Sequence, residues 1–171
     1  MARGRARGDA EFVEFAQAAT ARLVHAAFLM TGDHHRAEDA AQTALVRTYA
    51  SWSRIRDDDA YGYARRILVN HLVDGWRRPL REYPTEQVPE QRRDDVADEV
   101  VTRRWLTAIL GALSPRERAI VVLRYYFDLP EAQVARELAI SVGTVKSTSS
   151  RALEKLRAAG PLTVDNQEVR R

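Results

Sequence analysis

The sequence predicts an all-α protein made of two small helical domains joined by a flexible linker. Apolar residues recur with a period near 3.6 in almost every segment, and the alternating pattern of strands is absent. The polar stretch 51–59 breaks the helical pattern briefly, and the Pro-containing and charged stretch 80–98 interrupts it for longer. Apolar residues form 45% of the chain and charged residues 30%, which supplies a core and disfavours a disordered chain.

Three helices are expected in the first half of the chain. The first covers about residues 9–30, and Gly32 is placed to stop it. The second covers about residues 34–50, and the third about residues 60–76, just before two arginines and a proline. Three such amphipathic helices are sufficient to close a small core.

The second half predicts a further helical block. A helix is expected from about residue 99 to Gly111, and Ser114 and Glu117 then form a capping box with Pro115 at the first helical position. Pro130 opens a short helix, and Ser141 caps a longer one that runs to about residue 157.

These elements divide the chain into five parts. Residues 1–8 are expected to be a mobile basic tail, 9–79 the first domain, 80–98 the linker, 99–158 the second domain and 159–171 a mobile tail.

The last two helices carry the strongest functional signal. A turn of about three residues joins them, which is typical of a helix-turn-helix. On the second helix of the pair, the outward positions are mostly short hydroxyls around two basic residues: Thr144, Lys146, Ser147, Ser150, Arg151 and Glu154. Such a face can approach DNA closely, and Arg151 has the geometry to bond a guanine edge twice. Residues 144–158, Lys155 included, carry a local charge of +3, equal to that of the whole chain.

The second block resembles region 4 of the extracytoplasmic-function (ECF) sigma factors of bacterial RNA polymerase, most specifically in VGTVKS followed by Ser-Arg-Ala. In the first block, AEDAAQTALVRTYASW resembles the region 2 helix that docks on polymerase, and YARRILVNHLVDGWRR resembles the helix that meets the promoter −10 element. The resemblance implies an all-α sigma factor without enzymatic chemistry, which binds core RNA polymerase, recognises promoter DNA and assists its melting. It assigns −35 contacts to Thr144, Lys146, Ser147, Ser150 and Arg151.

The same resemblance assigns residues of the first domain. It places −10 contacts at Tyr63, Arg66, Asn70, Asp74, Arg77 and Arg78, with Asn70 and Asp74 at a pocket for a flipped base. Arg65 is a further candidate for holding phosphates. Paired arginines at a helix end also serve simply to complement its dipole, and that reading stays open.

The same resemblance assigns docking on core polymerase to Glu38, Asp39 and Gln42. Their spacing alone shows only a polar patch, equally compatible with an ordinary acidic helix start. Members of the family are frequently held by an anti-sigma factor, although no residue of this sequence reports one.

Other function classes find less support. The chain has no Cys, which excludes disulfides and thiol catalysis, and no cofactor or metal site is expected from its four histidines. The sequence shows neither a membrane-spanning stretch nor a secretory signal, so a cytoplasmic protein without membrane insertion is expected. Two alternatives remain. A dimeric transcriptional regulator would not need the polymerase- and promoter-like helices of the first block. A helical adaptor that binds no DNA is disfavoured by the chemistry of the recognition helix.

Overall fold

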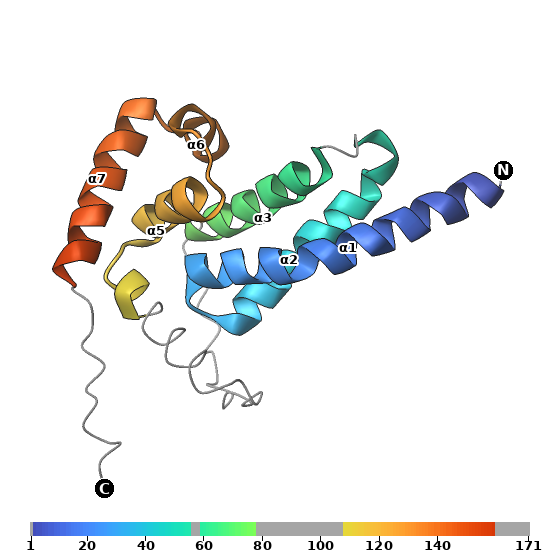
Figure 1. Ribbon diagram of the computed structural model, residues 1–171, viewed down its shortest axis with the longest axis horizontal. Coiled ribbons are helices and arrows are strands. Elements are labelled where there is room, and N and C mark those ends of the chain that lie inside the picture. Colours follow the sequence, from blue (N-terminus) through green and yellow to red (C-terminus); the bar gives the residue numbers. More distant parts are fainter. Residues whose placement is uncertain (1, 56–58, 78–107, 160–171) are drawn as a thin grey trace, which may run out of the picture.

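The computed structural model describes residues 2–55, 59–77 and 108–159. Every regular element within these ranges is helical, which confirms the predicted all-α class (Figure 1). The expected linker at 80–98 and the start of the helix expected near residue 99 lie outside the described residues. So does the expected tail at 159–171, apart from Ala159.

The first domain is a bundle of three helices, α1 (Ala2–Thr31), α2 (His34–Ala50) and α3 (Ala60–Arg77), with the short 3-10 turn η1 (Trp52–Arg54) after α2. The boundaries of α2 and α3 agree with the prediction. Helix α1 begins at Ala2, so residues 2–8 continue the first helix and do not form the separate tail expected from the sequence. Alanine and arginine are good helix formers, and here they outweigh the two glycines of that stretch.

Small side chains let the three helices approach closely. The inward face of α2 is formed by Ala37, Ala40, Ala41 and Ala44, each at most 1% exposed. Larger side chains from both neighbouring helices fill the remaining space, above all Leu23 and Met30 of α1 and Leu68 and Val69 of α3. Asp33 caps α2, since its side chain accepts a hydrogen bond from the Arg36 backbone N–H at 3.0 Å.

The second domain contains α5 (Pro115–Val121), the π-helical segment η3 (Val122–Tyr126), α6 (Glu131–Leu138) and α7 (Val142–Ala158). The predicted capping box is present: Ser114 Oγ accepts from the Glu117 N–H at 3.3 Å, and the Glu117 carboxylate accepts from the Ser114 N–H at 2.9 Å. These helices pack around four fully buried apolar side chains, Ile120, Leu123, Val134 and Val145.

The two domains pack directly against each other. Helix α3 contacts α6, and α1 contacts both α5 and η3, so the buried apolar residues of the two domains join in one cluster. Figure 1 shows α6 beside α3, with α7 on the side away from the first domain. Within the described ranges, no helix has the length and apolar character needed to cross a bilayer.

Candidate nucleic-acid and polymerase interfaces

The turn between α6 and α7 is tight and held by local hydrogen bonds. Ala139 turns the chain in a left-handed conformation (φ 52°, ψ 50°), and the Ile140 N–H donates to the Ala135 carbonyl at 3.0 Å. Ser141 then caps α7 by accepting from the Thr144 N–H at 3.0 Å. The pair therefore has the form of a helix-turn-helix, as the sequence predicts.

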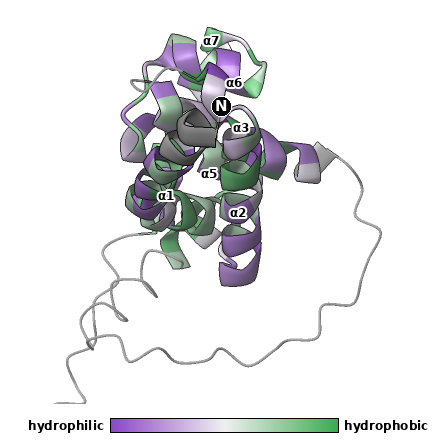
Figure 2. Ribbon diagram, turned by 90° about the vertical axis from the view of Figure 1, so that its right-hand side faces the viewer, coloured by the Kyte–Doolittle hydropathy of each residue, from purple (hydrophilic) through white to green (hydrophobic). Residues whose placement is uncertain are grey.

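Helix α7 has one buried and one exposed face. Val145, Thr148, Ser149 and Ala152 are buried against the rest of the domain. Four of the predicted −35 residues are exposed together on the other side: Lys146, Ser147, Ser150 and Arg151. The fifth, Thr144, is half-buried at the start of the helix, and its hydroxyl lies 2.8 Å from Ser141 Oγ. Figure 2 shows the hydrophilic character of much of α7.

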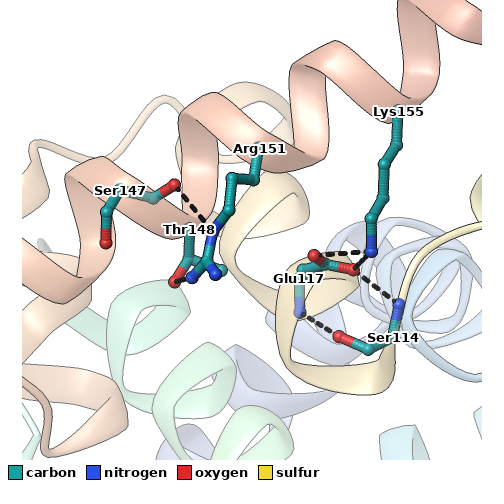
Figure 3. Close-up of polar contacts among 6 residues, drawn as sticks. All are labelled: Ser114, Glu117, Ser147, Thr148, Arg151 and Lys155. Atoms are coloured by element: carbon teal, nitrogen blue, oxygen red, sulfur yellow. Dashed lines mark hydrogen bonds and ion pairs between the residues drawn. The ribbon is translucent and has the colours of Figure 1, made fainter.

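Neither basic side chain of this face is firmly tied to the protein. Lys146 Nζ lies 3.8 Å from a carboxylate oxygen of Glu131 on α6. Arg151 folds along its own helix, with Nε 3.4 Å from the Ser147 carbonyl and Nη2 3.5 Å from Thr148 Oγ1 (Figure 3). These distances are at the long limit for hydrogen bonds and ion pairs, so both cations can be redirected to a ligand at little cost.

Lys155 pairs with an acidic side chain of its own domain and does not present a free positive charge to DNA. Its ammonium group lies 2.9 Å from both carboxylate oxygens of Glu117, the glutamate of the capping box on α5 (Figure 3). This contact ties the end of α7 to the start of α5. Part of the local positive charge counted from the sequence is therefore neutralised inside the domain.

The Glu117 contact makes the stability of the second domain dependent on pH. Hydrogen bonds from Lys155 and from the Ser114 N–H lower the pKa of Glu117, outweighing the opposing effect of burial. A lowered folded-state pKa adds stability above the ordinary value of about 4.3, and this is lost as the pH falls through the lower, folded value.

We expect Glu117→Gln to reduce the free energy of unfolding by about 1 kcal/mol at pH 7, a modest figure because Lys155 is half-exposed. Urea unfolding should show the difference in free energy of unfolding between variant and wild type closing as the pH falls below about 4.3. Glu154→Gln, an exposed change on α7, is the control. A gap that is independent of pH would contradict this role of the carboxylate.

The predicted −10 residues of α3 lie along one stripe of the helix, since positions 63, 66, 70 and 74 repeat every three or four residues. Asn70 and Asp74 are exposed. Arg66 is exposed too and pairs with Asp59 at 3.0 Å. Tyr63 is half-buried, and its hydroxyl donates to Ser51 Oγ at 3.1 Å. Arg77 ends α3, and Arg78 lies outside the described residues.

Arg65 does not share this stripe. Two positions along the helix from Tyr63, it projects from the opposite side of α3 and is 7% exposed. Its guanidinium Nη2 lies 2.7 Å from Glu137 Oε1 on α6. In this arrangement Arg65 joins the two domains and is not available to phosphates, contrary to the expectation from sequence.

The three predicted docking residues share the outer surface of α2. Glu38, Asp39 and Gln42 are all exposed, opposite the alanine face that packs in the bundle. Among residues 2–55, 59–77 and 108–159, the ionic contact of Asp39 is a long one, 3.9 Å from its Oδ2 to His71 Nε2 on α3. The patch is therefore free to accept a basic partner surface. Among the described residues, no group of three or more His, Cys, Asp or Glu side chains is arranged to hold a metal ion.

Comparison with known proteins identifies the family. Residues 8–82 match the family model of Sigma-70 region 2, and residues 103–156 match that of Sigma-70, region 4. The ECF RNA polymerase sigma factor SigL of Mycobacterium tuberculosis is 30% identical over 138 residues, which cover 77% of this chain and 78% of SigL. The chain belongs to the ECF sigma factors. It is therefore a DNA-binding factor of promoter-specific transcription initiation, acts with core RNA polymerase and is not an enzyme.

Other relatives agree with this assignment. The RNA polymerase sigma-E factor of Streptomyces coelicolor is 40% identical over 149 residues, covering 86% of this ECF sigma factor and 84% of the relative. Among solved structures, the sigma factor RpoE of Bartonella quintana, crystallised with the anti-sigma factor NepR, has a TM-score of 0.62. It is 19% identical and covers 91% of this chain and 98% of its own, a likeness that shows the shared fold.

Proposed function

We propose that this ECF sigma factor reads a promoter through two separate surfaces: the exposed face of α7 for the −35 element and the stripe on α3 for the −10 element. The observation that carries the proposal is the face of α7. It presents three short or flexible donors beside Arg151 on a well-capped helix of a helix-turn-helix. Recognition helices of this motif enter the major groove with such residues facing the bases.

The side chains of the stripe on α3 have the chemistry to bind a single DNA strand whose bases are unpaired. The Asn70 amide both donates and accepts hydrogen bonds, whereas ionised Asp74 only accepts, so together they can bond the edge of an unpaired base. Arg66 supplies a cation for the neighbouring phosphate, because its partner Asp59 is itself largely exposed and easily released. Arg77 and Arg78 would extend this basic surface. We propose that these contacts assist promoter melting.

The patch of Glu38, Asp39 and Gln42 is the proposed docking surface for core polymerase. Two carboxylates that lie exposed and loosely paired suit a basic partner surface. We expect the protein to work in the cytoplasm, where polymerase and promoter DNA are found. The relative crystallised with NepR suggests an anti-sigma factor as a further partner.

The test of promoter reading is selection from a randomised −35 library by holoenzyme, at one fixed salt concentration. Arg151→Ala should cost about 1–3 kcal/mol and relax the preference at one or two base pairs. Lys146→Ala should weaken binding evenly across sequences and reduce the salt slope by about one.

Arg157→Ala, an exposed change near the end of α7, is the control for loss of a positive charge. Equal effects of Arg151→Ala and Lys146→Ala on every sequence in the library would show that α7 clamps phosphates without reading bases.

A further inference from the structure

We propose that Lys146 is a modification site, at which transfer of an acyl group from an acyl phosphate weakens the binding of α7 to the −35 element. The proposal rests on the function proposed above, because it takes Lys146 as a contact to the DNA backbone. Three features of the protein support it: the scarcity of lysine, the exposure of this ammonium group, and the carboxylate that lies near it.

Lysine is rare in this chain. Of its 27 basic residues, 25 are arginines and two are lysines, Lys146 and Lys155. Arginine stays protonated and does not take up acyl groups, whereas the lysine amine is a usual target of acetylation. An acyl donor would therefore leave the arginines unchanged, including Arg151 on the exposed face of α7. Only these two side chains of the chain offer it an amine.

The two ammonium groups differ in how firmly the protein holds them. Lys155 Nζ donates to both carboxylate oxygens of Glu117 at 2.9 Å, and its side chain is 49% exposed. Lys146 has a side chain that is 66% exposed, and its Nζ lies 3.8 Å from Glu131 Oε2, beyond hydrogen-bonding distance. Two short bonds keep Lys155 engaged, which leaves Lys146 as the more accessible side-chain amine.

The surface around Lys146 suits an anionic acyl donor. A face proposed to bind DNA phosphates through exposed cations also attracts the phosphate group of an acyl phosphate. In the reaction, the ammonium group first gives one proton to water, and the Nζ lone pair then attacks the carbonyl carbon. An N–C amide bond forms and the C–O bond to the phosphate group breaks. The second proton leaves the nitrogen and passes to the departing phosphate, so hydrogen phosphate is released.

Acylation would lower the positive charge that α7 presents. Residues 144–158 carry +3, of which Glu117 neutralises the charge of Lys155, leaving +2. Acylation of Lys146 halves the remaining charge to +1. It also removes the cation 3.8 Å from the Glu131 carboxylate, so a less compensated negative charge meets the approaching phosphates. Both effects are independent of base sequence, so affinity should fall while base preference is kept.

The test treats the purified full-length sigma factor with acetyl phosphate, maps the acetylated residues by peptide mass spectrometry, and then adds core polymerase. Lys146 should be acetylated at least about tenfold faster than Lys155, since charge-assisted hydrogen bonds hold the latter. Holoenzyme made with the acetylated protein should bind every sequence of the −35 library more weakly. Its loss of affinity between about 50 and 200 mM salt should shrink about threefold, as one phosphate contact fewer predicts.

Three variants separate Lys146 from the other groups. Lys155→Arg keeps a cation beside Glu117 and should lose affinity on treatment as wild type does. Lys146→Arg should have one affinity before and after treatment, because a guanidinium takes up no acetyl group. The same variant accounts for acetylation of the N-terminal amine. Glu131→Gln should lessen the effect of treatment, since it removes the carboxylate that lies near the acetylated residue.

The modification site is overturned if Lys155 is acetylated as fast as Lys146, or if acetylated wild type keeps its affinity for DNA. A loss of affinity in treated Lys146→Arg equal to that of wild type would overturn it as well. The −35 library separates this result from the proposed function. An even loss of affinity on acetylation, together with an Arg151→Ala variant that keeps its base preference, would retain the modification site and reject the reading role of α7.

Discussion

Asp39→Lys is expected to weaken the binding of core RNA polymerase by about 2–5 kcal/mol, the usual cost of disrupting a desolvated charge pair at an interface. Asp39 has little role within the described part of the fold, where its one ionic contact is the 3.9 Å approach to His71 and its side chain is 75% exposed. The loss should therefore appear in polymerase affinity and not in folding. Titration of labelled sigma factor with core enzyme, together with a thermal unfolding curve, measures both quantities.

Glu14→Lys supplies the matched control, because it makes the same charge reversal at an exposed position of α1 outside the proposed patch. It should change polymerase affinity far less. If the two variants lose affinity equally, the effect is one of overall charge, and the docking surface must be sought elsewhere.

Leu68→Ala is expected to lower the free energy of unfolding by about 2–5 kcal/mol. Leu68 projects from α3 into the core of the first domain and is fully buried there. The alanines of α2 already bring the helices close together, which leaves little freedom for the bundle to collapse into the space created. Urea unfolding monitored by circular dichroism measures the loss.

The control is Val46→Ala on the outer face of α2, where 64% of the residue is exposed. It should shift the free energy of unfolding by less than about 0.5 kcal/mol. A small loss for Leu68→Ala would mean that this part of the bundle repacks easily.

Local features of this protein could be predicted well from sequence. The capping box at Ser114, the cap at Ser141 and the stop at Gly32 each depend on neighbouring residues, and all three are present in the structure. The division of α7 into buried and exposed faces follows likewise from helical periodicity. The extension of α1 back to Ala2 was missed because glycine and a run of arginines read as a tail.

Contacts between distant segments could not be predicted in this way. Lys155 and Glu117 are 38 positions apart, and Arg65 and Glu137 are 72 apart. In each pair both residues look like ordinary surface charges until the helices are packed. Composition and periodicity assign a residue to a face of its helix, but they do not say which other helix covers that face. The polymerase and −10 assignments likewise depended on family resemblance, with periodicity supplying only the shared faces.

Gly32 ends α1 with φ +70°, a backbone conformation that suits glycine, and it also lies beside the second domain. A Cβ built at this position would lie 3.3 Å from Arg118 Nη1, the end of a flexible side chain that needs to shift by only a few tenths of an ångström. The backbone conformation of the hairpin between α1 and α2 would instead be strained by any residue with a side chain. The identity of this residue is therefore set by the turn itself and only weakly by the neighbouring domain.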